Sequence, residues 1–390
     1  MAENKRILVV ISGREISMSQ PLPGIVAYQA RHPHLHLDFC LLDEASGNHG
    51  QLLKRNIVHF RPDGVLAAFF WPGAVRDIPR DLPVVNFSDI EHPHIPTVIF
   101  DQVRIGKMAA EHLREQDLPH YAFAALRRRG WGARLRWQGF HSRLLQAGHE
   151  AHLFDSSFPD TAHLLLDEDL RNWLQTLPKP IGIHAHYLVL AMRLLWACQD
   201  LKFRVPEEVA LIAGADMPLL TTMWAPAISA FRLDSREIGY EALRMLDRLL
   251  AGEAAPAGPV LILPQQLIVR QSSDRRGMRD PLVAQMRRLI AGSRQPITTK
   301  ELLGRVRHSR RTLERHFQRH LGRSLHDEIV AVRIARAQQL LQDKILPVKE
   351  IARQSGYATY HSFAAAFLRV TGVRVSDYRR GTSTHVLPNP

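Results

Sequence analysis

Cysteine is scarce in this sequence: only Cys40 and Cys198 occur among 390 residues. Two thiols can form at most one disulfide, and neither has a partner at Cys-x-x-Cys spacing, so a disulfide framework is excluded and no thiolate zinc site is predicted. Long apolar runs are missing too, since no segment approaches the roughly 18 consecutive apolar residues of a membrane-spanning helix. The apolar start at 7–11 is too short for a signal peptide. We therefore expect a cytoplasmic protein.

Signatures of catalysis are absent as well. The sequence has no G-x-S-x-G nucleophile elbow, no G-x-x-x-x-G-K-[ST] phosphate loop and no G-x-G-x-x-G after the first apolar run. Three histidine pairs occur, His34 with His36, His92 with His94, and His184 with His186. No carboxylate or thiolate is spaced with them, and two histidines alone do not make a metal site. We expect no enzyme activity, no cofactor and no metal.

The net positive charge is confined to one end of the chain. Residues 281–390 carry 20 Lys+Arg and 7 Asp+Glu, a net charge of +13, whereas the preceding 280 residues carry 31 of each. A neutral region joined to a compact basic one is expected when only the second region binds a polyphosphate. A membrane surface is the alternative partner, but the basic residues alternate with apolar ones instead of forming a polybasic run. The charge therefore favours DNA.

Two different kinds of domain are predicted. Between 6 and 270, short apolar runs alternate with amphipathic stretches, a pattern typical of parallel sheets covered by helices on both faces. The polar stretch QSSDRRGMRD at 271–280 predicts a linker. Beyond it, six or seven short helical patterns predict a small all-α domain, with Thr298 and Ser309 as helix N-caps. We place the domains at 1–271 and 281–390, with a linker at 272–280.

The basic region contains two segments with one plan, at about 298–321 and 347–371. In each, a short helix and a tight turn precede a second, amphipathic helix. The apolar face of the second helix carries Leu313 and Phe317 in the first segment, and Phe363 and Phe367 in the second. The opposite face could enter the major groove of DNA or simply face solvent. Its candidate DNA-contacting residues are Arg310, Arg311, Glu314, Arg315, Tyr360, His361 and Ala364.

The run IARQSGYATYHSFAAAFLRVTGVRVSDYRR at 351–380 resembles the signature of the AraC/XylS family of transcription regulators. ARAQQLL at 335–341 resembles the helix that joins the two helix-turn-helix units of that family. Val375 departs from the pattern, which usually has proline there. The matching positions are Ile351, Ala352, Gly356, Tyr357, Phe363, Phe367, Gly372, Tyr378 and Arg379. The resemblance implies two helix-turn-helix units that place the candidate residues against base edges.

The neutral region, 6–270, resembles the effector-binding core of LacI/GalR repressors, which is similar to periplasmic sugar-binding proteins. The stretches that carry this likeness are TVIFDQVRIGKMAAEHL, GARLRWQGF and VALIAGADMPLLTTMWAPAISAFRLDSREIGYEAL. It implies two Rossmann-like lobes with an effector held between them. By position, the effector ligands are Arg136, Asp216, Asp101 and His186, with Phe70 or Trp71 stacking on a sugar face. Asp101 could instead cap a helix, and the aromatic residues could instead pack in the core.

Together, the two resemblances imply a ligand-gated regulator that binds double-stranded DNA as a homodimer. The expected effector is a monosaccharide, and the expected role is activation of genes for uptake and catabolism of a D-xylose-like sugar. RNA polymerase is a further candidate contact. The alternatives are a repressor, or a regulator that responds to another sugar, a polyol or an acidic metabolite. The last alternative would draw on the arginine run at 127–129, and the loop at 12–20 does not match the family's polar residues.

The charge distribution makes a prediction that needs no structure. Residues 281–390 alone should bind DNA, and their affinity should fall steeply as salt rises, because binding releases counterions from the phosphates. Titrations of labelled duplex at several salt concentrations would measure the slope. An affinity that is absent or insensitive to salt would contradict the assignment of this domain.

Overall fold

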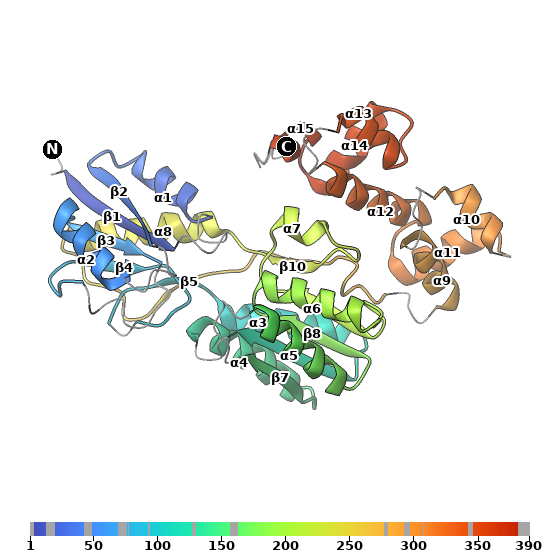
Figure 1. Cartoon of the computed structure of the whole chain (residues 1–390), viewed down its shortest axis with the longest axis horizontal. Coiled ribbons are helices and arrows are strands. Elements are labelled where there is room, and N and C mark those ends of the chain that lie inside the picture. Colours follow the sequence, from blue (N-terminus) through green and yellow to red (C-terminus); the bar gives the residue numbers. More distant parts are fainter. Residues whose placement is uncertain are drawn as a thin grey trace.

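The computed structural model of the chain comprises an α/β region and a separate helical domain (Figure 1). It describes residues 4–12, 20–42, 49–68, 76, 78–92, 94–126, 130–156, 163–276, 280–291, 297–306, 308–341 and 346–380. Within these residues, no helix has the length and apolar character required to cross a bilayer. The predicted fold class, a two-lobed α/β domain followed by an all-α domain, is confirmed.

The first lobe is built on a parallel sheet in the order β2-β1-β3-β4. Alternate residues of β1 pack on opposite sides of it, with Ile7 and Val9 in one core and Leu8 and Val10 in the other. Such burial on both faces explains the continuous apolar runs of the sequence. Helix α8 returns from later in the chain to pack on α1, β3 and β4. The elements are β1 (Lys5–Ser12), α1 (Leu22–Gln29), β2 (Leu35–Leu42), α2 (His49–Phe60), β3 (Gly64–Ala67), β4 (Val84–Asn86) and α8 (Ser235–Leu250).

The second lobe holds a sheet in the order β12-β10-β9-β8-β6-β7, in which β10 and β12 pair antiparallel and the other neighbours are parallel. The chain passes between the lobes after β5 (Val98–Phe100), after β10, and between β11 (Val260–Ile262) and β12. The strands are β6 (His120–Leu126), β7 (Ala151–Ser156), β8 (Ile181–Ala185), β9 (Val209–Ala213), β10 (Ser229–Arg232) and β12 (Gln266–Ile268). The helices are α3 (Gln102–Glu115), α4 (Trp131–Leu145), α5 (His163–Thr176), α6 (Leu188–Asp200) and α7 (Pro218–Thr222).

Helices α3 and α4 cross with almost no space between their backbones. A Cβ atom at Gly106 would lie 2.1 Å from the carbonyl oxygen of Arg136, and one at Gly139 would lie 2.0 Å from that of Val103. Both positions therefore require glycine, because any side chain would force the helices apart. This close approach brings Arg136 of α4 next to Gln102 at the start of α3.

The helical domain has two separate apolar cores, one for each predicted helix-turn-helix unit. Leu313 and Phe317 lie in the first core, and Phe363 and Phe367 in the second. Helix α12 contributes residues to both cores, which makes it the predicted spacer. The helices are α9 (Pro281–Ala291), α10 (Thr299–Arg305), α11 (Arg310–Leu321), α12 (Leu325–Leu340), α13 (Val348–Gln354), α14 (Tyr360–Thr371) and α15 (Val375–Arg380).

Local signals of the sequence define the ends of these helices. Thr298 caps α10 in a capping box with Glu301, and Ser309 caps α11 by accepting a hydrogen bond from the Thr312 backbone N–H, as predicted. Gly322 ends α11 and Gly372 ends α14, both in the left-handed region at φ 66° and 72°. Glycine adopts that conformation without steric cost, so α11 and α14 end in the same way.

The segment predicted to be a linker differs from that expectation, because its first residues are buried. Ser272 and Ser273 are fully buried, and the Ser272 hydroxyl donates to the Leu211 carbonyl at 2.6 Å. Small hydroxyl side chains can be buried when hydrogen bonds satisfy them, so a polar sequence here did not imply exposure. Asp274, which is 2 % exposed, then forms ion pairs with Arg276 at 2.9 Å and with Arg323 of the helical domain at 3.3 Å.

We predict that Asp274→Asn destabilises the chain by about 3 kcal/mol, because removal of one partner leaves buried charge unpaired. Burial alone would raise the pKa of the Asp274 carboxyl, but the hydrogen bond from Arg276 and the charges of Arg287 and Arg323 lower it overall. The stabilisation is therefore complete above the unfolded pKa of about 3.9 and is lost as pH falls through the folded value. Urea unfolding at neutral pH would measure the change, with the exposed Asp81→Asn as a control expected to stay within about 0.5 kcal/mol. Equal stability of the two variants would contradict the prediction.

Candidate DNA-binding surface and effector site

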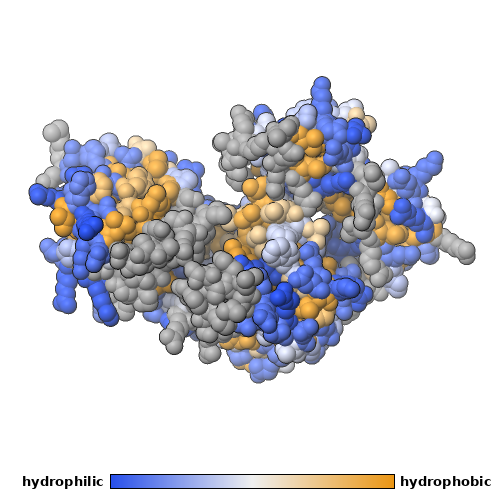
Figure 2. Space-filling view, viewed as in Figure 1, coloured by the Kyte–Doolittle hydropathy of each residue, from blue (hydrophilic) through white to orange (hydrophobic). Residues whose placement is uncertain are grey.

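The two candidate recognition helices begin in the same manner. Ser309 precedes α11 and Thr359 precedes α14, and each side chain accepts a hydrogen bond from a backbone N–H of the first turn at 3.2 Å. Each cap fixes where its helix starts and so fixes which side chains project from the first two turns. The face of the molecule in Figure 2 shows hydrophilic residues over the outer parts of the helical domain, with apolar areas between them.

On α11 the predicted arginines are exposed. Arg310 has a side chain that is 68 % exposed, and Arg311 and Arg315 are exposed as well. Within the described residues, neither Arg311 nor Arg315 has a hydrogen bond or ion pair that would hold its guanidinium. Glu314 differs from them, since its carboxylate accepts a hydrogen bond from the Leu325 backbone N–H at 3.1 Å. That contact ties α11 to the start of α12, a role that the sequence did not predict.

On α14 the three predicted residues are in different surroundings. Tyr360 is 45 % exposed and His361 is exposed, so both can reach a partner outside the protein. Ala364 is half-buried and packs against the second core. Phe363 and Phe367 on the opposite side are fully buried, as the pattern predicts. Helix α14 therefore offers fewer polar groups to DNA than α11 does, and these seven DNA contacts remain predictions.

In the α/β region, Arg136 is at the centre of a buried polar group. Its guanidinium donates from Nε and Nη2 to the Gln102 side-chain oxygen, at 2.8 and 2.5 Å, and from Nη1 to the His186 carbonyl at 2.8 Å. Arg136 is 4 % exposed, and burial lowers its pKa to about 10, which keeps it charged at neutral pH. A guanidinium has five N–H donors. Three of them make these contacts, so two donors have no partner among the described residues.

The group connects the two lobes through Asp89, which follows β4. Its carboxylate accepts hydrogen bonds from the Tyr187 hydroxyl at 2.9 Å and from His186 Nε2 at 3.4 Å, both at the end of β8. The Asp89 backbone carbonyl also accepts from the Gly132 N–H at 3.0 Å. Asp89 is the charge that favours the protonated form of Arg136. A carboxylate of the first lobe and a guanidinium of the second thus lie at the boundary between lobes.

The imidazole of His186 has one unsatisfied nitrogen. Burial and the nearby Arg136 charge lower its pKa to about 4, although Asp89 opposes this shift. The ring is therefore neutral at physiological pH, and with Nε2 donating to Asp89 its Nδ1 is an acceptor. Nδ1 is buried and has no partner among the described residues. A buried acceptor without a donor is rare in a folded protein, and a bound hydroxyl would satisfy it.

Asp216, predicted together with Arg136 as an effector ligand, has no contact with this polar group among the described residues. Its carboxylate forms an ion pair with Arg270 at 2.9 Å and accepts from the Thr221 hydroxyl at 2.6 Å. Arg270, at the end of the α/β region, is the counter-charge of Asp216. Whether Asp216 binds an effector stays a prediction.

The other predicted effector residues have separate positions. Asp101 caps α3 by accepting a hydrogen bond from the Arg104 N–H at 2.9 Å, which is the alternative role given above. Phe70 and Trp71 lie outside the described residues, as do most of the loop at 12–20 and the arginine run at 127–129. Sequence reasoning missed Gln102, Asp89 and Tyr187. Gln102 directly follows Asp101 and Tyr187 directly follows His186, so a closer search beside the predicted residues would have found these two. Asp89 lies in the other lobe, and no sequence signal joined it to them.

Among the described residues, the three histidine pairs form no metal-binding group. The His34 ring nitrogen lies 3.0 Å from the Asp247 carboxylate, and His184 is fully buried among aromatic rings that include Phe123 and Phe231. One group of three residues in the described part of the chain has metal-binding geometry, and it lies elsewhere, at Asp280, His316 and His320. No sequence pattern joined these three, because Asp280 is distant along the chain from the two histidines.

Comparisons with known proteins match both domains. A periplasmic binding protein-like domain matches residues 110–273, and a helix-turn-helix domain matches residues 302–381. The xylose operon regulatory protein of Haemophilus influenzae is 28% identical over 328 residues, which cover 81% of this chain and 84% of that protein. Its counterpart in Escherichia coli K12 is 28% identical over 331 residues, covering 81% and 83%. The predicted combination of domains is thereby confirmed.

A solved structure agrees with these matches. The structure of a xylose-binding transcription activator has a TM-score of 0.67 and 25% sequence identity, and the match covers 97% of this chain and 99% of that chain. The matched proteins are regulators of transcription and not enzymes, as the absence of catalytic motifs predicts.

The geometry of α11 predicts how its arginines act. Arg311→Ala or Arg315→Ala should weaken binding to the specific DNA site by roughly 1 to 3 kcal/mol if the guanidinium contacts a guanine, and should affect random DNA much less. Arg319→Ala, an exposed arginine of the last turn, serves as the matched control. Competition titrations with specific and random duplexes would separate the two effects. Equal losses on both duplexes would show that the residue contacts phosphate only.

Proposed function

We propose that this chain, a helix-turn-helix transcription regulator homologous to the xylose operon regulatory proteins, is a homodimeric activator gated by a small sugar. The sugar would bind between the two lobes of the α/β region, and the paired helical domains would bind operator DNA. One observation carries the sugar proposal, namely the polar group of Arg136, Asp89 and His186 at the boundary between the lobes.

The chemistry of this group suits a neutral polyhydroxyl ligand. Sugar hydroxyls both donate and accept hydrogen bonds, so they can pair with the remaining guanidinium donors and with the His186 Nδ1 acceptor. Asp89 supplies further acceptor capacity from the opposite lobe. A ligand that contacts both lobes stabilises their closed arrangement by its differential affinity for that state. Phe70 or Trp71 remains a proposed stacking surface for the sugar ring.

The same group disfavours an acidic effector. The Asp89 carboxylate is ionised at neutral pH. Burial raises its pKa, but the hydrogen bonds from His186 and Tyr187 and the charge of Arg136 outweigh this effect, so the pKa is lowered overall. A second carboxylate or a phosphate brought next to it would be repelled, and Arg136 already has its counter-charge. A sugar or polyol is therefore the preferred class, and the names of the relatives make D-xylose the first compound to test.

Helix α7 offers a route from the effector site to the DNA-binding units. Asp216 bonds Thr221 of α7, and the neighbouring Thr222 hydroxyl lies 3.4 Å from the Tyr378 hydroxyl of α15. Helix α7 also contacts α12. A sugar hydroxyl that donates to Asp216 would compete with the Thr221 hydroxyl and the Arg270 guanidinium for the carboxylate, and α7 would shift against the helical domain. Such a shift couples occupancy of the sensor to the position of the second unit.

We predict that D-xylose raises the unfolding temperature of the full chain. At a hundredfold excess over its dissociation constant, a ligand of the folded state adds about 2.7 kcal/mol of stability. Asp89→Asn should weaken sugar binding about tenfold or more, since it removes a charged hydrogen-bonding partner. Differential scanning fluorimetry with a panel of sugars, polyols and organic acids is the measurement, and Asp81→Asn is the control.

Asp216→Asn tests the second proposed ligand separately. If Asp216 contacts the sugar, this variant loses the thermal shift. If it only couples the domains, the shift remains while the sugar no longer changes DNA affinity. A panel in which only organic acids raise the unfolding temperature would contradict the sugar proposal.

A further inference from the structure

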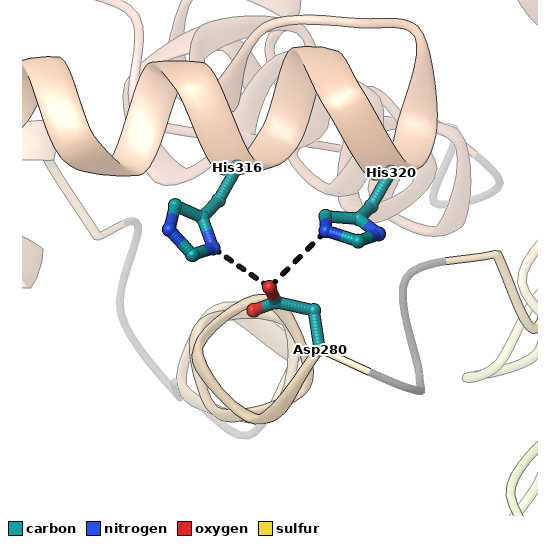
Figure 3. Close-up of side chains that lie close together, drawn as sticks. All are labelled: Asp280, His316 and His320. Atoms are coloured by element: carbon teal, nitrogen blue, oxygen red, sulfur yellow. Dashed lines mark hydrogen bonds and ion pairs between the residues drawn. The ribbon is translucent and has the colours of Figure 1, made fainter.

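We propose that Asp280, His316 and His320 form a binding site for a divalent transition-metal ion of the zinc type. The three side chains offer one carboxylate oxygen and two imidazole nitrogens, and these atoms lie within 4.8 Å of one another. Figure 3 shows both rings pointing from one helix toward the same carboxylate. Two nitrogens and one oxygen from three protein residues, with a water as fourth ligand, is a common donor set for zinc.

The distances fit a single ion after a small adjustment. Asp280 Oδ2 lies 2.7 Å from His316 Nδ1 and 3.3 Å from His320 Nε2. Ligands held about 2.1 Å from a tetrahedral zinc ion are about 3.4 Å apart, so Asp280 Oδ2 and His316 Nδ1 must move apart by about 0.7 Å. Both imidazoles already direct a nitrogen at the carboxylate oxygen, and an ion placed between them would replace the hydrogen bond of His316 and the ion-pair contact of His320.

The protein backbone holds the three ligands in place. His316 and His320 are four residues apart on α11, which puts them on one face of that helix. Asp280 is fixed at the start of α9, where its other carboxylate oxygen, Oδ1, accepts a hydrogen bond from the Val283 N–H at 2.9 Å. Phe317 of α11 and Met286 of α9 are fully buried in the shared core beneath the site. The site therefore spans two packed helices and needs no folding step to form.

Exposure and charge also permit an ion to enter. The imidazole side chains are 30% and 32% exposed and the Asp280 side chain is 10% exposed, so water can reach the open coordination position. Asp280 supplies one negative charge, and neutral imidazoles supply none, as the two histidines must be deprotonated to bind metal. The bound ion would join α9, which follows the connecting segment, to α11, the first recognition helix.

Cobalt(II) is the probe that tests this site in the full chain, because a tetrahedral Co²⁺ site with nitrogen and oxygen ligands absorbs visible light strongly and hydrated Co²⁺ does not. We expect one such Co²⁺ per chain, and we expect excess Zn²⁺ to remove the absorption, since zinc binds the same ligands more tightly. His316→Gln, His320→Gln and Asp280→Asn should each weaken Co²⁺ binding by more than about tenfold, because even loss of an outer-shell partner costs about 10- to 100-fold.

The controls separate this site from the other histidines of the chain and from misfolding. His308→Gln and His326→Gln change exposed histidines of the same domain and should leave the absorption unchanged. Asparagine caps helices as well as aspartate does, so Asp280→Asn should remain folded by circular dichroism. An absorption band that persists in His316→Gln and His320→Gln, or its absence in the unmodified chain, would show that the three residues form a hydrogen-bonded ion pair only.

Discussion

The buried carboxylate of Asp274 is the interaction on which the joining of the two domains depends. It lies three residues before the undescribed stretch 277–279, in a segment whose serines are hydrogen-bonded inside the α/β region. From the other side, Arg287 of α9 and Arg323 after α11 direct their guanidinium groups to it, and both also pair with Glu328. With Arg276, which also pairs with Asp274, two carboxylates and three arginines therefore form one partly buried ion-pair network. Such a network tolerates no missing member, because the remaining charges would stay buried without partners.

The sequence predicted the elements well because their signals are local. The continuous apolar run of β1, the capping box at Thr298 and the glycines after α11 and α14 each depend on residues a few positions apart. The helix-turn-helix units could be placed for the same reason. The character of the connecting segment could not, since burial of Ser272 depends on partners more than 40 residues away. Polarity alone does not distinguish a serine exposed to solvent from a buried serine whose hydroxyl is hydrogen-bonded within the protein.

Only part of the effector site was predicted, because its contacts also join residues that are far apart in the sequence. Arg136 and His186 were predicted from their positions in the resemblance to LacI/GalR repressors, and both belong to the polar group between the lobes. Asp216 was assigned to the same group although its charge is used by Arg270, which is 54 residues further along the chain. Pairing of charges is decided in three dimensions, and two strand ends one sheet position apart can direct their side chains to different partners. Asp89, from the opposite lobe, could only be found once the lobes were placed together.

Helix α12 fixes the relative rotation and separation of α11 and α14. It is one continuous element that packs into both cores of the helical domain, so α11 and α14 are attached to a single rod (Figure 1). Each residue of an α-helix adds about 1.5 Å and turns the chain by about 100°. Insertion of one residue into α12 would hence rotate one unit by more than a quarter turn relative to the other, while translating it very little. If both units bind one DNA duplex, its helical repeat constrains the length of α12, and this helix should tolerate changes of sequence far better than changes of length.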